Sequence, residues 1–163
     1  MAKEGVNIHA SCVLLARAGS AFGAPANAGV LLLGESGHGK SDLALRLIGL
    51  GAKLVSDDRT DLFVERKRLW ARAPANLAGL IEVRGLGIVA LPHRAEARVA
   101  LAVLLDGKPA RLPSRETYKT SFDLSAPPPL LRLAPFEASA PARIALAVAA
   151  FEGKLLRQTA HRK

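Results

Sequence analysis

Aromatic residues and cysteine are both scarce in this sequence of 163 residues: aromatic side chains make up 4% of it, and there is one cysteine. So few rings argue against a stacking platform for nucleic-acid bases. A single cysteine excludes an internal disulfide, which fits a reduced, cytoplasmic setting. Cys12 lies in the apolar run Cys12–Leu15. That run predicts a buried thiol on a strand, with nothing beside it to make it nucleophilic.

Long apolar runs and targeting signals are missing as well. No stretch reaches the roughly 18 apolar residues that a membrane-spanning helix needs, and Met1–Gly5 lacks the apolar core of a signal peptide. We therefore expect an intracellular protein without a membrane segment. The length predicts one domain over residues 1–163. Half of the residues are hydrophobic, so the core should consist mainly of Leu, Val, Ile and Ala.

The formal net charge of +9 suggests nucleic acid as a partner. The positive residues are spread over an Ala-, Leu- and Arg-rich background, however, and no helix-turn-helix, finger or ribonucleoprotein motif is visible. We expect no nucleic-acid partner. A basic surface suits an anionic nucleotide and an acidic protein partner equally well.

A glycine-rich loop carries the clearest functional signal, because it satisfies the pattern G-x-x-x-x-G-K-[ST]. Its residues are Gly34, Glu35, Ser36, Gly37, His38, Gly39, Lys40 and Ser41. The glycines allow backbone N–H groups to converge on phosphate oxygens. Lys40 suits the β- and γ-phosphates, and the Ser41 hydroxyl suits Mg²⁺. An apolar strand precedes the loop and an amphipathic helix follows it. The loop therefore predicts ATP and Mg²⁺ as cofactors.

Two adjacent carboxylates, Asp57 and Asp58, end the short strand predicted after the loop's helix. If that strand runs parallel to the strand before the loop, its end lies beside the loop. One carboxylate there can accept the proton of an incoming hydroxyl, and another can hold Mg²⁺ through water. The alternative is a capped turn, for which Ser-Asp-Asp-Arg is also suitable.

Two further polar residues interrupt apolar strands. Glu82 stands alone among Leu80, Ile81 and Val83, and a buried carboxylate needs a cation such as Mg²⁺ or Arg. The competing interpretation is a solvent-facing strand position. His9 lies on the strand before the glycine loop. It can either contact Asp57 or serve as an ordinary hydrogen-bonded core histidine.

Hydrophobic patterning predicts the remaining elements. Strands are expected over residues 8–15, 29–33, 52–56, 61–64, 68–71, 80–83, 88–91 and 98–105, and helices over 40–50 and 142–156. Residues 17–28 should form a broad loop, and 157–163 a frayed tail. Residues 108–139 hold most of the prolines and should be irregular, with short extended pieces. We predict an α/β fold, a mixed sheet with the glycine loop between a central strand and a helix.

Four segments together resemble the C-terminal catalytic domain of the HPr kinase/phosphorylase family. They are Ile8–Ala10, the glycine loop, Val55–Asp58 and the run Ile81–Ile88, which reads I-E-V-R-G-L-G-I. The resemblance implies a fold like that of phosphoenolpyruvate carboxykinases. It also implies ATP-dependent phosphorylation of a serine on the phosphocarrier HPr, which many members reverse by phosphorolysis. Members usually form hexamers, so a homo-oligomer is expected. The match begins almost at Met1, so the chain looks like a short form without the separate N-terminal domain.

The resemblance also assigns roles to individual residues. Asp57 looks like the general base, with Asp58 beside it and His9 orienting it. Ser41 and Glu82 look like the Mg²⁺ ligands. Lys40 looks like the phosphate-binding lysine, and Arg111 matches a catalytic arginine of the family approximately.

Two alternatives remain on the sequence alone. A small-molecule kinase can carry the same glycine loop, and so can a nucleotide-binding regulator without catalysis. The presence of both Asp57 and Glu82 argues against the regulator.

Overall fold

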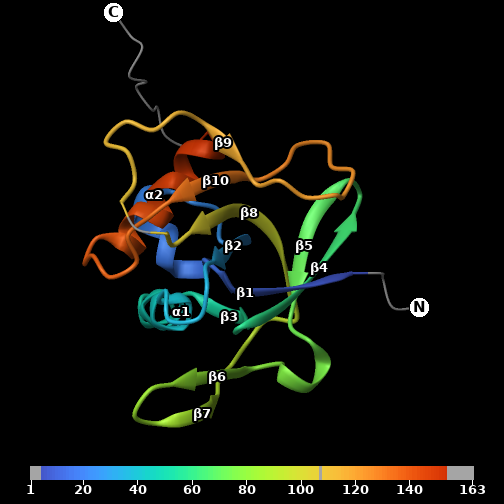
Figure 1. The fold of residues 1–163 in the computed structure, drawn as a ribbon, viewed down its shortest axis with the longest axis vertical. Helices are drawn as coiled ribbons and strands as arrows, with labels where there is room; N and C mark the ends of the chain where they lie inside the picture. The colour runs from blue at the N-terminus through green and yellow to red at the C-terminus, as the bar shows by residue number, and fades with distance from the viewer. Residues whose placement is uncertain (1–4, 107, 154–163) are drawn as a thin grey trace, which may run out of the picture.

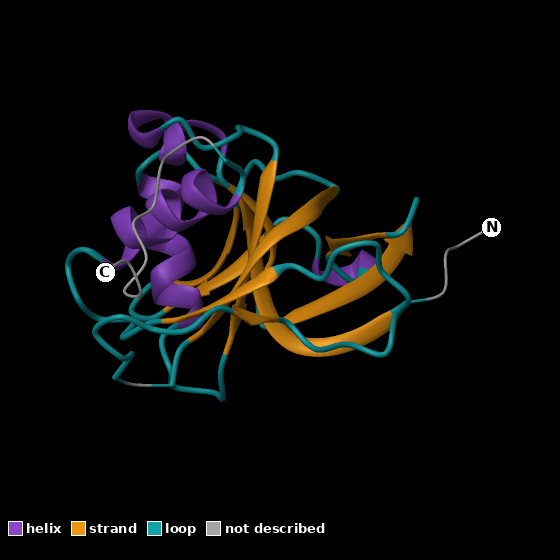
Figure 2. Cartoon of the chain, turned by 90° about the horizontal axis from the view of Figure 1, so that it is seen from above, coloured by secondary structure: helices purple, strands orange, loops and turns teal. Residues whose placement is uncertain are grey.

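The chain folds around a strongly curled mixed sheet with helices gathered on one side of it (Figures 1 and 2). The computed structural model describes residues 5–106 and 108–153. The strands of the main sheet are β1 (Val6–Leu14), β2 (Ala28–Leu33), β3 (Lys53–Ser56), β4 (Arg59–Glu65), β5 (Arg68–Arg72), β8 (Glu96–Leu104), β9 (Glu116–Thr117) and β10 (Pro129–Arg132). A separate hairpin consists of β6 (Leu80–Val83) and β7 (Gly87–Ala90).

The helical elements are α1 (Lys40–Gly49), α2 (Ala140–Phe151) and two short 3₁₀ helices, η1 (Ala16–Phe22) and η2 (Ala75–Leu77). None of the helices in the described part of the chain is long and apolar enough to cross a membrane.

The strand order brings several strand ends to one edge of the sheet. The hydrogen-bonded path runs β2-β1-β4-β5-β8, and β8 then pairs with β2, so the sheet closes on itself. β2 is parallel to β8, and β8 is parallel to β10. β1 is antiparallel to both β2 and β3, so β3 runs in the direction of β2 with β1 between them. The carboxyl ends of β2, β3, β8 and β10 therefore point the same way.

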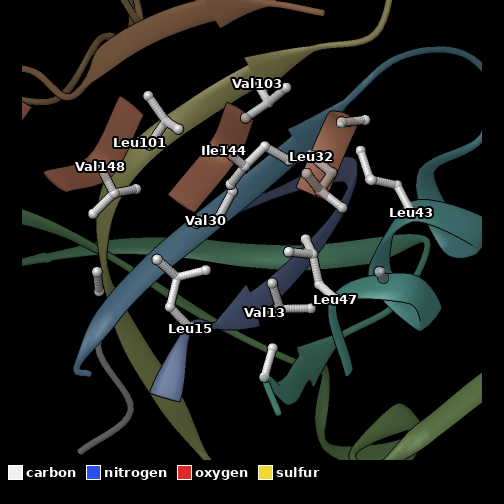
Figure 3. Packing of buried hydrophobic residues seen from close by; sticks show 14 of the residues in the cluster. Val13, Leu15, Val30, Leu32, Leu43, Leu47, Leu101, Val103, Ile144 and Val148 are labelled. Carbon is white, nitrogen blue, oxygen red and sulfur yellow. The ribbon is translucent and has the colours of Figure 1, made fainter. Parts of the chain in front are cut away.

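Two apolar clusters hold this arrangement together. Between the sheet and the helices, Val30 and Leu32 of β2 pack with Leu101 and Val103 of β8 and with residues of α1 and α2 such as Leu47 (Figure 3). Alternate residues of β2 and β1 point into the curl of the sheet, where Leu31 and Cys12 belong to the second cluster. β2 is thus buried on both faces, which its continuous apolar run allows. Each such side chain contributes roughly 1.5–3 kcal/mol when fully buried.

The single cysteine is buried, as predicted. Cys12 has no exposed surface, and burial raises the pKa of its thiol to about 12. The thiol therefore stays protonated at neutral pH and has no nucleophilic role.

Two predicted elements differ from the structure, and the proline-rich segment agrees with its prediction. Residues 17–22, predicted as part of a loop, belong to η1, whose chain turns at Gly23 (φ 77°). The proline-rich segment is irregular with short extended pieces, β9 and β10, and β10 joins the main sheet as a parallel neighbour of β8. α2 begins two residues before the predicted start, with a proline in its first turn, and ends at Phe151. Residues 154–156 of the predicted helix and the predicted frayed tail lie outside the described residues.

Candidate functional site

A cavity of about 470 Å³ opens where α1 begins, at the edge that the strand directions share. Its walls come from the glycine loop (residues 34–41) and α1, from the turn after β3, from the end of β6, and from the segment between β10 and α2 (residues 133–139). The lining residues are Ser36, Gly37, Gly39, Lys40, Ser41, Asp42, Leu45, Asp58, Glu82, Val83, Arg84 and Phe136.

The glycine loop has the backbone that its sequence predicted. Gly37 and Gly39 both have a φ of 88°, in the left-handed region that a side chain disfavours. A Cβ on Gly39 would also lie 2.9 Å from the Cζ atom of Phe136. No side chain caps the first turn of α1, so its N–H groups remain available to an anion.

Lys40 is almost fully buried beneath the loop, with 5% of its surface exposed. Its Nζ atom donates to the carbonyl oxygens of Gly34 (2.7 Å) and Glu35 (3.1 Å). Burial lowers the pKa of Lys40, while the charges of Asp58 and Asp57 act in the opposite direction. The ammonium group is thus placed inside the curve of the loop, where it can meet a phosphate group.

Asp57 joins three elements through its carboxylate. Oδ1 accepts hydrogen bonds from Ser41 Oγ (2.6 Å) and Ser11 Oγ (3.0 Å). Oδ2 accepts one from the backbone N–H of Glu82 (3.2 Å). The residue is 8% exposed. The end of β3 therefore lies beside the glycine loop, as the strand directions predicted, and Asp57 has its lone pairs directed at fixed donors.

Asp58 turns away from Asp57 and faces the cavity. Its φ of 65° is left-handed, and its backbone N–H donates to Ser11 Oγ (3.1 Å). Its side chain is 61% exposed, and Oδ1 lies 2.6 Å from His9 Nε2. The predicted contact between His9 and Asp57 is therefore wrong. The left-handed turn sends the second carboxylate, not the first, towards His9.

Glu82 reaches the cavity from the β6–β7 hairpin, which stands apart from the main sheet (Figure 1). Its side chain is exposed, so this strand position faces solvent, and the carboxylate is one of the groups that line the cavity. Arg84, two residues further on, also lines the cavity. The hairpin tip is apolar and exposed at Leu86 (78%) and Ile88 (67%).

Arg111 does not join these residues. It is exposed in the segment between β8 and β9 and is not among the residues that line the cavity. The structure therefore does not support the catalytic position predicted for Arg111, which rested on an approximate motif match. Arg84 is the arginine that the cavity contains.

Sequence reasoning also missed Ser11 and Phe136. Ser11 is completely buried, and its hydroxyl contacts both aspartates of the turn. It was hidden inside an apolar strand, where a serine gives no motif. Phe136 was hidden in the proline-rich segment, although an aromatic residue in so aromatic-poor a chain is an available signal.

The donor set near the glycine loop suits a hard cation. In the described residues, no group of three or more His, Cys, Asp or Glu side chains could hold a metal ion. The oxygen donors that line the cavity include Ser41, Asp58 and Glu82. Asp57 lies next to them, since its carboxylate accepts a hydrogen bond from the Ser41 hydroxyl. Mg²⁺ is commonly held by one or two carboxylates together with substrate phosphates. These residues therefore fit a magnesium ion that arrives with a nucleotide.

The chain is similar in sequence to HPr kinase/phosphorylases. Residues 24–94 match the model of the HPr Serine kinase C-terminal domain. The chain is 37% identical over 112 residues to the HPr kinase/phosphorylase of Latilactobacillus sakei subsp. sakei, covering 61% of this chain and 36% of that protein. It is 53% identical over 62 residues to the one from Leptothrix cholodnii, covering 37% of this chain and 19% of that protein. The chain thus spans about a third or less of the length of these curated relatives.

A solved structure shares the fold. The HPr(Ser) kinase/phosphatase from Coxiella burnetii superposes with a TM-score of 0.66 at 26% sequence identity, over 87% of this chain and 88% of that chain. The predicted mixed α/β fold and the resemblance to HPr kinase/phosphorylases are therefore confirmed. The matched range 24–94 contains three of the four motif segments, all except Ile8–Ala10.

Proposed function

We propose that this chain, whose residues 24–94 match the model of the HPr Serine kinase C-terminal domain, is an ATP- and Mg²⁺-dependent protein-serine kinase whose acceptor is the phosphocarrier HPr. One observation carries the proposal. Ser41 of the glycine loop donates to Asp57 at 2.6 Å, while Asp58 faces the same cavity as the loop. A phosphate-binding loop and two carboxylates at one cavity are the parts that phosphoryl transfer from a nucleotide requires.

The loop and α1 would bind the triphosphate. Backbone N–H groups of the loop and the first turn of α1 would donate to phosphate oxygens, and Lys40 would neutralise charge on the β- and γ-phosphates. Ser41, Asp57 and Glu82 are the residues that would hold Mg²⁺, which neutralises charge on the β- and γ-phosphates when bound. Since Asp57 already fixes the Ser41 hydroxyl, we assign Asp57 to this metal side of the cavity.

Asp58 is the better candidate for the general base. It lines the cavity, whereas Asp57 is buried and accepts three hydrogen bonds. In the proposed step, an Asp58 carboxylate oxygen takes the proton of the acceptor serine. The serine oxygen forms a bond to the γ-phosphorus as the bond from that phosphorus to the bridging oxygen breaks, and ADP leaves. His9, 2.6 Å from Asp58, would orient the carboxylate.

The assignment of HPr as partner rests on the relatives, whose printed name is HPr kinase/phosphorylase. The same proposal includes the reverse reaction, in which inorganic phosphate removes the phosphoryl group from phosphoserine. It also includes a cytoplasmic location and a homo-oligomeric state, for which the family resemblance implies a hexamer.

The test is direct phosphorylation. Purified protein is mixed with MgATP and HPr, and the mass of HPr is measured over time. We expect the gain of one phosphoryl group, and its loss when phosphoserine-HPr is incubated with inorganic phosphate. A Lys40→Ala variant is the control that should show neither reaction. If HPr gains no phosphate while ATP is consumed with a metabolite, the chain is a small-molecule kinase. If ATP binds without any turnover, the chain is a nucleotide-binding regulator.

A further inference from the structure

An exposed aromatic ring forms part of the wall of the cavity that Asp58 also lines. Phe136 is 68% exposed in a chain that is only 4% aromatic, yet it lines the same cavity as the glycine loop. Its ring lies against the loop, because a Cβ on Gly39 would lie 2.9 Å from Cζ and 3.1 Å from Cε1 of Phe136. One part of the ring is thus seated on the loop backbone, and most of its surface remains free.

The strand order explains why Phe136 is on that side. β2, β8 and β10 are successive parallel neighbours. The glycine loop follows β2, and the segment containing Phe136 follows β10. The Asp57–Asp58 turn follows β3, which lies on the other side of β2 beyond β1. The cavity lies outside the carboxyl ends of these strands, since residues that follow β2, β3 and β10 line it. A triphosphate with its terminal group towards Asp58 therefore has its base on the β10 side.

Hydrogen bonds and an ion pair within the protein hold the backbone around Phe136 in place. The guanidinium of Arg46 on α1 donates to the carbonyl oxygens of Pro135 and Glu137 (3.3 Å for the latter) and to Asp42 (3.0 Å). The Glu137 carboxylate pairs with Arg143 of α2 at 2.9 Å. Both residues flanking Phe136 are therefore anchored, and the ring is presented at a fixed place. In Figure 1 this segment, drawn in orange-red before α2, approaches α1 from one side while the β6–β7 hairpin lies on the other.

We propose that Phe136 is the stacking platform for the nucleobase of the bound nucleotide. Leu45, which is partly exposed and lines the same cavity, supplies further apolar surface near the base. This proposal rests on the proposed nucleotide-dependent function and adds a binding residue to it. Stacking accepts every base because each has a flat π-face. The platform therefore contributes to nucleotide affinity and orientation, not to specificity for one base.

The test compares MgATP with magnesium tripolyphosphate, which has the three phosphates but neither ribose nor base. Dissociation constants are measured by calorimetry for the wild type, Phe136→Ala, Phe136→Trp and the control Leu50→Ala. Leu50 is an equally apolar exposed residue (59%) at the far end of α1. We expect Phe136→Ala to weaken MgATP about 5- to 100-fold and to leave tripolyphosphate unchanged. Phe136→Trp should bind MgATP like the wild type. The fluorescence of the introduced tryptophan should change with MgATP and not with tripolyphosphate.

The two ligands separate the possible results. If Phe136→Ala loses affinity equally for both ligands, the ring only supports the loop. If it loses affinity for neither ligand, the base binds elsewhere. Both results overturn the base platform while leaving nucleotide binding intact. Wild-type protein that binds neither ligand would overturn the proposed function, and the platform with it.

Discussion

The two sides of the cavity are built differently. On the β3 side, the carboxylate of Asp57 and the hydroxyl of Ser11 are buried and hydrogen-bonded to one another and to neighbouring elements. On the β10 side, Phe136 is exposed, and the main anchor of its segment is the guanidinium of Arg46. On the β3 side, buried polar atoms link three elements. On the β10 side, the Phe136 segment is held by the partly exposed guanidinium of Arg46 on α1.

This difference separates chemistry from binding. Groups that move protons and hold charge need fixed geometry. Buried hydrogen bonds fix the Asp57 carboxylate directly, and they fix the exposed Asp58 carboxylate through its backbone N–H, which donates to the buried Ser11 hydroxyl. An apolar platform needs only an available face, which tolerates small movements. Substitutions on the β3 side should therefore affect turnover and stability strongly, and substitutions on the β10 side should mainly affect nucleotide affinity.

The largest effect is expected from Asp58→Asn. Loss of the base should slow phosphoryl transfer to HPr by about 10²- to 10⁴-fold, with the MgATP dissociation constant little changed. Transfer is measured by mass spectrometry and binding by calorimetry. Asp61→Asn is the matched control, because Asp61 lies on β4 and its carboxylate contacts Asn7 outside the cavity. If Asp57→Asn, and not Asp58→Asn, abolishes transfer while sparing binding, the two roles are reversed.

Asp57→Asn should act on stability and on magnesium binding together. The amide replaces one acceptor oxygen with an N–H donor that faces other donors, among them the hydroxyls of Ser11 and Ser41. Leaving a buried donor without an acceptor costs about 1–3 kcal/mol. Urea unfolding should show this loss, and MgATP binding should weaken more than binding of ATP without Mg²⁺. An unchanged unfolding midpoint would contradict the network described for the β3 side.

Ser11→Ala removes the hydroxyl that contacts both aspartates. We expect a loss of about 1–3 kcal/mol in the free energy of unfolding and a lower kcat with little change in the KM for ATP, because the turn that carries Asp58 loses its support. Ser11→Thr keeps the hydroxyl and should restore most of the kcat. If Ser11 positions Asp58, Ser11→Ala should also alter the pH dependence of kcat. If Ser11 has only a structural role, Ser11→Ala should lower stability and leave that pH dependence unchanged. The pH profile of kcat is therefore the deciding measurement.

The smallest effect is expected on the β10 side, from Arg46→Ala. The guanidinium is partly exposed and its partners include backbone carbonyls, so its loss should change stability by no more than about 1 kcal/mol. MgATP affinity should fall a few-fold because the Phe136 segment loses its anchor, while kcat stays near that of the wild type. A large fall in kcat would show that the β10 side also contributes to catalysis and not only to nucleotide binding.

Much of the fold was predictable from local patterns. The strand before the glycine loop, the loop itself and α1 follow one another in the sequence, so a short window contains all the information that shapes them. The buried state of Cys12 followed from its apolar neighbours in the same way. The pairing of β10 with β8 and the helical turn η1 were not predicted, because neither has a periodic apolar signal and each is stabilised by contacts with distant segments.

The sequence by itself determined the chemistry of the glycine loop, since the spacing of its glycines, Lys40 and Ser41 is a local property of the backbone. It also placed two carboxylates at a neighbouring strand end. Only the tertiary structure decided which carboxylate faces the cavity, because that depends on the left-handed φ of Asp58 and on His9, which lies 49 residues away in the sequence. The tertiary structure likewise left Arg111 out of the cavity and brought Phe136 onto Gly39, since strand order, not sequence distance, determines which loops meet at the edge of a sheet.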